Sequence, residues 1–369
     1  MQNNIIKKKR LRVLLIRFSS IGDIILTTPV IRALKESYPD LILDYLTLKE
    51  YAILLKDNPY IDNLITTDRK GTAGAVKTAL QLRGNNYDFI FDLHRSTRSL
   101  IFRAILKADY KYKFKKNYIK RFLLTAFKLR FYRKPYSVVN RYFNTLKRLN
   151  LPNEHKSEIW LNTDDVKKAI LKINKIAGTK FSFIAAAGGA APVSRKLFRE
   201  KERRMISIMP FAKWKTKEWG DDKFIGLGLR LKKAGVILCI LGGTEDAERA
   251  DKIAHAIGKG ALSLAGKLTL AETATALAVS DCLVTNDTGV MHIGGAVSIP
   301  VVAVFGSTAE ELGFFPYKSE GEVVQIDLKC RPCTAKGLPA CPKKHFKCMN
   351  DISVDMVYST VRKCIGTLL

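Results

Sequence analysis

The stretch that decides the fold reads RVLLIRFSSIGDIILTTPVIRALK and runs from Arg12 to Lys35. Residues 13–16 form an unbroken apolar run, which is typical of a strand buried on both faces of a parallel sheet. A short polar loop follows, and apolar residues then recur at roughly helical spacing. The pattern therefore predicts a strand–loop–helix unit, with Asp23 at the junction between the loop and the helix.

The position of Asp23 suggests a chemical role. In open α/β sheets, ligands bind beyond the carboxyl ends of the strands. Gly22 lets a substrate approach the backbone closely, and a carboxylate beside it is a candidate general base. An acidic residue at this place also suits the cap of a helix, and both interpretations stay open.

The composition predicts a globular protein of two domains. The chain has 369 residues, of which 47% are hydrophobic. Its first ten residues lack the apolar segment of a signal peptide, and no run of about eighteen apolar residues predicts a membrane span. The seven cysteines are an odd number in a large chain and do not suggest a disulfide scaffold, so we expect a reducing cytoplasm.

The charge is strongly positive and unevenly distributed. A net charge of +29 predicts an anionic partner. Residues 107–148 concentrate this charge among interleaved aromatic residues, with Asp109 as the only acid. We call this the basic aromatic region. It suits stacking on single-stranded nucleic acid, contact with an anionic bilayer, or a solvated helical face whose aromatic rings pack inward.

Strands alternate with helices along most of the chain, which predicts two doubly wound α/β domains. The expected strands cover residues 42–46, 62–66, 88–92, 205–209, 236–241, 282–285 and 301–305. A linker near residues 151–157 divides the chain into domains 1–155 and 156–369. Two such domains facing each other would form a deep cleft between the carboxyl edges of their sheets. Residues 185–204 read as an exposed insertion or mobile loop, with no chemistry assigned.

Three strand ends in the second domain carry polar groups. The first is rich in lysine around Lys217, the second is a Gly242-Gly243 turn followed by Glu245, and the third runs from Asp287 to His292. Lysines suit phosphate, an acid suits ribose hydroxyls, and a helix start suits a pyrophosphate. Together they predict a nucleotide-diphosphate site. The glycine fingerprints of NAD-binding and P-loop proteins do not occur, which disfavours both classes.

Taken in order, these motifs resemble those of the glycosyltransferase family 9 heptosyltransferases. The matching segments are FSSIGDIILTTP at residues 18–29, KEW at 217–219, GG at 242–243 and NDTGVMH at 286–292. The resemblance implies two facing Rossmann-like domains of the GT-B fold. It also implies transfer of heptose from ADP-heptose to the lipopolysaccharide inner core, with inversion and with no catalytic metal or other cofactor.

The resemblance also implies roles for individual residues. Asp23 matches the family's proposed base, and Lys217 matches the lysine that neutralises the departing phosphates. The donor-binding positions are Gly22, Thr216, Gly242, Glu245, Asp287, Thr288, Gly289 and His292. The acceptor-binding positions in the first domain are Arg69, Lys70, His94, Arg95 and Arg98.

The expected partners are ADP-heptose and an anionic lipopolysaccharide precursor, either Kdo-lipid A or its heptosylated form. We expect the protein in the cytoplasm, with peripheral contact to the cytoplasmic face of the inner membrane, and no nucleic-acid partner. Pro210-Phe211-Ala212 departs from the family's usual Pro-Gly-Ala turn. A family member with another sugar or acceptor is therefore the main alternative, ahead of a nucleic-acid-binding protein or an epimerase built on similar domains.

Four of the cysteines lie close together in a lysine-rich segment. A CxxC pair is followed by two further thiols, a set compatible with structural zinc, with redox-labile pairs or with plain reduced thiols. The residues are Cys330, Cys333, Cys341 and Cys348. Because they lie far in sequence from Asp23, we expect any metal held there to be structural.

Overall fold

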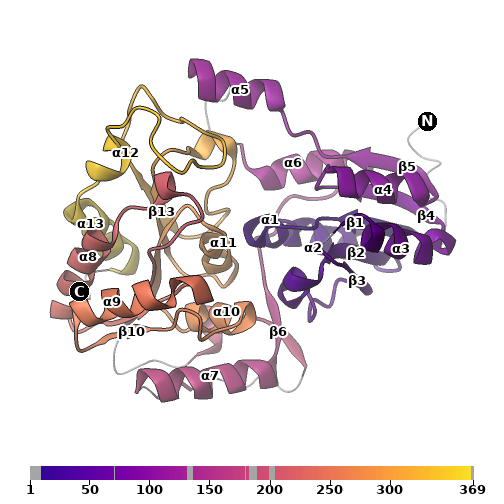
Figure 1. The fold of residues 1–369 in the computed structure, drawn as a ribbon. Helices are drawn as coiled ribbons and strands as arrows, with labels where there is room; N and C mark the ends of the chain where they lie inside the picture. The colour runs from indigo at the N-terminus through magenta and orange to yellow at the C-terminus, as the bar shows by residue number, and fades with distance from the viewer. Residues whose placement is uncertain are drawn as a thin grey trace. The chain divides into compact units, whose positions relative to one another are not determined.

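The computed structural model describes residues 10–69, 71–130, 136–178, 180–182, 189–198 and 204–366. Its contacts divide the chain into two compact units (Figure 1). Unit 1 comprises residues up to 116 together with 138–160, and unit 2 comprises residues 117–137 together with those from 161 onward. The predicted boundary after residue 155 lies near this division, whereas residues 117–137, predicted in the first domain, group with unit 2.

Unit 1 contains one parallel sheet of five strands in the order β3-β2-β1-β4-β5. The strands are β1 (Arg12–Ile16), β2 (Ile42–Leu48), β3 (Asn63–Thr67), β4 (Tyr87–Asp92) and β5 (Ala108–Lys113). The helices are α1 (Ile21–Ile25), α2 (Thr28–Ser37), α3 (Ala73–Gln81), α4 (Thr97–Ile105) and α6 (Val138–Thr145). Helices α3 and α4 cover one face of the sheet, and α2 packs against α6.

The opening apolar run is the central strand, as predicted. Residues 13–16 are fully buried in β1, and the core cluster beneath α3 and α4 includes Leu14 and Ile16. The single helix expected after it is two helices, α1 and α2. Pro29 has no N–H to donate to the carbonyl of Ile25, and the Thr28 hydroxyl donates to that carbonyl instead, at 2.8 Å. The chain therefore starts a new helix at this point.

Unit 2 contains a parallel sheet of six strands in the order β10-β9-β8-β11-β12-β13. The strands are β8 (Met205–Met209), β9 (Ile237–Ile240), β10 (Ala261–Ser263), β11 (Cys282–Asn286), β12 (Val301–Phe305) and β13 (Gly321–Gln325). The helices are α5 (Tyr118–Phe127), α7 (Thr163–Ala177), α8 (Asp221–Lys233), α9 (Ala247–Ile257), α10 (Leu270–Ala278), α11 (Gly289–Ala296), α12 (Lys347–Asn350) and α13 (Val354–Ile365). Helices α8, α9 and α13 form one layer, and α7 packs on α10, which contacts α11 (Figure 1).

Both sheets are doubly wound, so the predicted α/β class with two Rossmann-like domains of the GT-B fold is confirmed. The strand order reverses between β1 and β4 in unit 1 and between β8 and β11 in unit 2. Loops that leave the sheet in opposite directions separate at these points, which is where open α/β sheets bind ligands. The loop bearing Asp23 follows β1, and the loops bearing Lys217 and Asp287 follow β8 and β11.

The basic aromatic region does not form one uniform surface. Part of it, where lysine alternates with tyrosine, forms strand β5, which the sequence pattern did not predict. In this strand Tyr110 and Tyr112 stack against Phe89 and Phe91 of the neighbouring strand β4. Phe114 and Tyr142 are buried. For these rings the inward-packing interpretation is correct, and among the described residues of the region the exposed aromatic side chains are concentrated in α5.

The segment predicted as an exposed insertion packs against unit 2 where it is described. Residues 190–192 form β7, which pairs with β6 (Trp160–Asn162) in a small sheet. Val193 and Phe198 are buried, and Arg195 forms an ion pair with Asp281 at 3.0 Å. The expectation of exposure is therefore wrong for Val193 and Phe198, whose apolar side chains are buried, whereas Ala190, Pro192 and Lys196 are exposed as expected. Residues 183–188 and 199–203 lie outside the described part of the chain.

Candidate active site

Asp23 lies in the first turn of α1, directly after the carboxyl end of β1. Its Oδ2 atom accepts hydrogen bonds from the Ser20 hydroxyl at 2.9 Å and from the Ser20 backbone N–H at 3.3 Å. This pairing of Ser20 and Asp23 forms a capping box that starts the helix. The capping interpretation is thus correct, and it leaves Oδ2 on the exposed side of the carboxylate.

The other oxygen of Asp23 faces a buried arginine. Arg17 Nη2 lies 2.5 Å from Asp23 Oδ1, and Arg17 also donates to the backbone oxygens of Ser19 and Leu93. The Tyr142 hydroxyl from α6 donates to the same Oδ1 at 3.3 Å. These contacts fix both the position and the orientation of the carboxylate.

The protonation state of Asp23 follows from these contacts. Burial acts to raise the pKa of the Asp23 carboxyl, but the charge of Arg17 and the hydrogen bonds from Ser20 and Arg17 together hold that pKa below its ordinary value. Asp23 is therefore ionised at neutral pH. It has the charge state that a general base requires.

Of the predicted acceptor residues, Arg69 follows β3, His94 and Arg95 follow β4, and Arg98 lies in the first turn of α4. Burial lowers the pKa of His94 to about 4, so its ring is neutral at pH 7 and packs on Phe18 with the centroids 5.3 Å apart. The guanidinium of Arg98 lies over the ring of Phe18, 5.8 Å from its centroid. The structure thus brings His94 and Arg98 together around Phe18.

Two further predicted acceptor residues are held differently. Arg69 forms an ion pair with Glu50, which offsets its charge, while its backbone oxygen accepts from Arg98. Arg95 adopts a left-handed backbone conformation with φ of 52°, and its N–H donates to Asp92. Lys70 lies outside the described residues.

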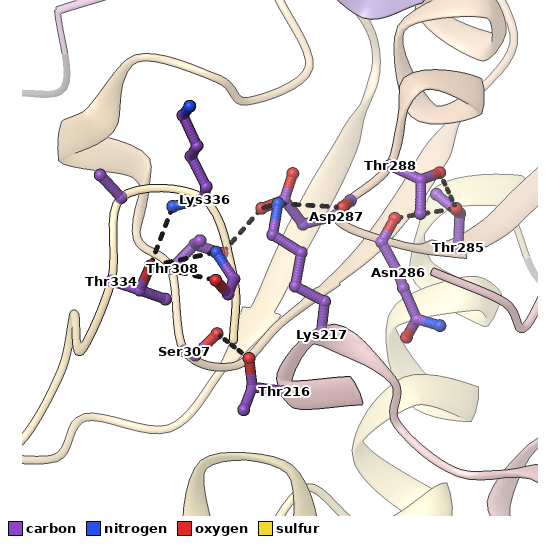
Figure 2. Close-up of polar contacts among 12 residues, drawn as sticks. Thr216, Lys217, Thr285, Asn286, Asp287, Thr288, Ser307, Thr308, Thr334 and Lys336 are labelled. Carbon is purple, nitrogen blue, oxygen red and sulfur yellow. Dashed lines mark hydrogen bonds and ion pairs between the residues drawn. The ribbon is translucent and has the colours of Figure 1, made fainter. Parts of the chain in front are cut away.

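The strand ends of unit 2 form a second polar cluster (Figure 2). Lys217 ends a 3-10 turn after β8, and its Nζ lies 2.5 Å from Oδ2 of Asp287, which follows β11. Thr308, from the loop after β12, donates its hydroxyl to the same oxygen at 2.7 Å. One carboxylate therefore connects three loops at the carboxyl edge of the sheet.

A buried asparagine fixes the spacing of these loops. Asn286 donates to the Pro210 carbonyl at 2.7 Å and accepts the Trp219 backbone N–H at 3.1 Å. Because both partners lie on the segment that carries Lys217, this clamp holds the lysine opposite Asp287.

The remaining predicted donor residues surround this cluster. Thr288 and Gly289 begin α11, whose first N–H groups point to the carboxyl edge, and His292 is buried one turn further along. Gly242 packs on Phe211 so closely that a Cβ atom would lie 2.9 Å from its ring. The carboxylate of Asp246 accepts the Gly243 N–H, which leaves Glu245 as the exposed acid of this turn.

Thr216 was predicted to bind the donor, but in the structure its hydroxyl bonds to other residues of the protein. Its hydroxyl donates to the Leu338 carbonyl at 3.0 Å, accepts the Leu338 N–H at 2.8 Å and accepts the Ser307 hydroxyl at 3.0 Å. Thr216 therefore holds the loop around residues 334–338 beside the cluster, and its hydroxyl is engaged by the protein itself.

Sequence reasoning missed three members of these clusters: Arg17, Tyr142 and Thr308. Thr308 had a usable signal, because it follows an apolar strand at residues 301–305 in the same way as the polar residues that were recognised. Arg17 ends an apolar strand and reads as an ordinary boundary residue. Tyr142 lies 119 positions from Asp23, and nothing local indicates the contact.

The four clustered cysteines are free thiols. The Cys333 thiol donates to the Cys330 carbonyl at 3.0 Å, and Cys330 Sγ lies 3.8 Å from Nε2 of His345. Burial, followed by the nearby thiols, raises the pKa of Cys348 to about 11 even though Arg331 opposes the rise. Among the described residues, no three histidine, cysteine or acidic side chains are grouped so as to hold a metal ion.

Comparisons with known proteins agree with this architecture. The chain is 28% identical to lipooligosaccharide heptosyltransferase 2 of Campylobacter jejuni over 172 residues, 45% of this chain and 53% of that protein. The chain thus spans about half the length of that relative. It is 26% identical to lipopolysaccharide heptosyltransferase 3 of Escherichia coli over 301 residues, 78% of this chain and 80% of the relative.

Two solved structures share the fold. A glycosyltransferase family 9 protein from Veillonella parvula has a TM-score of 0.75 at 21% identity, covering 96% of this chain and 97% of that one. ADP-heptose LPS heptosyltransferase II of E. coli has a TM-score of 0.71 at 20% identity, covering 96% and 98%. The model of glycosyltransferase family 9 (heptosyltransferase) matches residues 75–343, well over half of the sequence. The chain therefore belongs to glycosyltransferase family 9.

Proposed function

We propose that this protein transfers heptose from ADP-heptose to an acceptor of the lipopolysaccharide inner core, in a single displacement that inverts the anomeric centre. The observation that carries the proposal is the polar cluster at each strand-order reversal: a carboxylate held by Arg17 in unit 1, and a lysine held by Asp287 in unit 2. The names of the heptosyltransferase relatives support heptose and lipopolysaccharide as the substrate classes.

Asp23 acts as the general base in this proposal. Both oxygens accept hydrogen bonds, but Oδ1 faces the cation of Arg17 whereas Oδ2 has only Ser20 as its partner, so Oδ2 receives the proton of the acceptor hydroxyl. The deprotonated oxygen attacks C1 of the sugar as the bond from C1 to the ADP oxygen breaks. The fixed carboxylate reduces the entropy lost in aligning base and nucleophile.

Lys217 acts on the leaving group. Its ammonium and the N–H groups at the start of α11 stabilise the charge that develops on the departing diphosphate. Glu245, exposed after the Gly242-Gly243 turn, accepts hydrogen bonds from the ribose hydroxyls. The ion pair with Asp287 keeps Lys217 in place, and Asp287, Thr288, Gly289 and His292 complete the donor contacts. This chemistry proceeds without a catalytic metal.

The acceptor is an anionic lipopolysaccharide precursor, Kdo-lipid A or its heptosylated form. The cationic and aromatic groups around Phe18, His94 and Arg98 support contact with acidic sugars. An acceptor with a lipid anchor requires the enzyme at the cytoplasmic face of the inner membrane. Among the described residues no helix is both long and apolar enough to cross a bilayer, and we propose a peripheral contact.

The test measures ADP release from ADP-heptose with and without Kdo-lipid A and its once-heptosylated form. Release that depends on one acceptor supports the proposal and identifies the preferred acceptor. Release with a different nucleotide sugar, but not with ADP-heptose, favours the alternative of a family member with another donor. We include other nucleotide sugars because Pro210-Phe211-Ala212 differs from the family's usual Pro-Gly-Ala turn. Absence of nucleotide binding in calorimetry would contradict the assignment of the unit 2 cluster.

A structural zinc ion on Cys330, Cys333, Cys341 and Cys348 stays a prediction. The Cys333 thiol donates to the Cys330 carbonyl, which brings the CxxC pair together, but no three histidine, cysteine or acidic side chains of the described residues are grouped so as to hold a metal ion. Metal analysis of the purified protein tests the point. About one zinc per chain supports the site, and a value well below that removes it.

A further inference from the structure

Helix α5 and the residue pair after it have an unusual distribution of side chains. Tyr118, Ile119, Phe122, Phe127 and Leu129 are 58%, 75%, 61%, 64% and 50% exposed. They are five of the ten large apolar side chains that the described part of the chain leaves exposed. An ordinary surface helix turns its apolar residues to the core, so this concentration on twelve consecutive positions indicates a partner.

Two cationic residues, one in α5 and one directly after it, hold the helix to the rest of unit 2. Arg121 donates to the Ala335 carbonyl at 3.4 Å, and Lys128 donates to the Pro332 carbonyl at 2.8 Å. Of the residues of α5, only Leu124 is buried. The helix is thus anchored by its cationic side chains and by one leucine, and its main apolar surface faces outward.

The charge around this surface indicates the chemistry of the partner. No acidic residue occurs from Tyr110 to Asn153. Lys115, three residues before α5 in the sequence, and Lys120, within the helix, are exposed. A partner that satisfies both features must be apolar and anionic over the same area. A bilayer with anionic headgroups meets this condition, because acyl chains receive the apolar side chains while the headgroups pair with the lysines.

We propose that α5 is a membrane-binding helix that inserts Ile119 and Phe122 into the boundary between headgroups and acyl chains of an anionic bilayer. This inference rests on the proposed contact with the inner membrane and deepens it. It assigns the contact to one helix and not to the whole basic aromatic region. It also makes apolar insertion, rather than charge alone, the main contribution to binding.

The test is sedimentation with large unilamellar vesicles of phosphatidylethanolamine and phosphatidylglycerol, with phosphatidylcholine vesicles as the uncharged comparison. We expect the full chain to bind the anionic vesicles. The double variant Ile119→Ser/Phe122→Ser should bind about a hundredfold less, since each side chain contributes roughly tenfold. The double variant Lys115→Gln/Lys120→Gln should bind about thirtyfold less, with a weaker dependence on salt.

The chain offers a matched control. Leu80 and Leu100 are each 53% exposed on α3 and α4. The variant Leu80→Ser/Leu100→Ser removes a similar apolar area and should bind vesicles like the wild type. Vesicle binding by the α5 apolar variant at the wild-type level would overturn the inference. So would a wild type that ignores vesicles but self-associates, or binds a single-stranded oligonucleotide, through the same side chains.

A second readout separates this inference from the proposed function. ADP release is measured with an acceptor lacking acyl chains, for which the α5 apolar variant should match the wild type. Loss of vesicle binding with retained turnover supports both proposals. Vesicle binding through α5 without turnover on any acceptor supports the membrane helix and contradicts the heptosyltransferase proposal.

Discussion

The Asp23 cluster of unit 1 and the Lys217 cluster of unit 2 are built alike but have opposite polarity. Each lies where the strand order of a parallel sheet reverses, and each contains an ion pair of 2.5 Å. In unit 1 the arginine is buried and one oxygen of the carboxylate faces the exposed side. In unit 2 the carboxylate is buried and bound also by Thr308. The same topological position therefore carries a carboxylate beside a buried arginine in unit 1 and a lysine beside a buried carboxylate in unit 2.

The largest expected effect comes from removing the carboxylate of unit 1. Asp23→Asn should lower turnover by a factor between about a hundred and ten thousand, the usual range for loss of a general base. ADP affinity should be unchanged, because the proposed nucleotide contacts lie in unit 2. Steady-state kinetics and calorimetry with ADP measure the two quantities. Asp44→Asn, which removes another buried carboxylate paired with an arginine, serves as control. Wild-type turnover in Asp23→Asn would refute its role as base.

Removal of the cation of unit 2 should affect binding and turnover together. Lys217→Met takes away the ammonium that we propose faces the leaving diphosphate, and we expect kcat/KM to fall about a hundredfold with weaker ADP binding. The control is Lys215→Met in the same turn, whose lysine is exposed and pairs with Glu218. Equal effects of the two variants would show that general positive charge, and not the position of Lys217, matters.

The third prediction concerns pH and applies to unit 1 alone. Arg17 holds the pKa of Asp23 below its ordinary value, so the wild type should keep its base ionised down to unusually low pH. Arg17→Met removes the opposing charge, which raises that pKa and moves the acidic limb of the kcat/KM profile to higher pH. At about pH 5 to 6 we expect roughly a tenfold loss relative to pH 8.

Two controls define the pH prediction. Arg12→Met removes the arginine at the other end of β1, which pairs with Asp44, and should leave the profile unchanged. Thermal unfolding of each variant identifies any general loss of stability. An Arg17→Met profile identical in shape to that of the wild type would show that Asp23 does not govern the acidic limb.

The smallest effect should come from Tyr142. Tyr142→Phe removes one 3.3 Å hydrogen bond to Asp23 and leaves the ring packed on Phe114, so we expect a fall in kcat of about threefold to fivefold with little change in KM. Tyr87→Phe, which removes a buried hydroxyl that donates to Asp44, controls for the loss of a buried tyrosine hydroxyl. An equal loss of activity in both variants would mean that Tyr142 acts only through stability.

The sequence by itself determined the class of fold and the presence of polar residues at the strand ends of both units. The apolar run Val13–Ile16 predicted a fully buried strand, because a strand inside a parallel sheet meets apolar neighbours on both faces. The same logic located β8, β9, β11 and β12, and hence Lys217 and Asp287 at their ends. Weakly apolar or very short strands, such as β5 and β10, escaped because their patterns resemble those of loops or surface segments.

Only the tertiary structure decided which of these residues meet. The contacts of Asp23 with Arg17 and Tyr142, and of Asp287 with Thr308, join segments that no local pattern connects. The same holds for the basic aromatic region, where composition predicts charge and aromaticity but not direction. Whether a ring packs inward, as Tyr112 does, or faces outward, as Phe122 does, depends on which neighbouring elements remain to cover it, and that is set by the assembled sheets and helices.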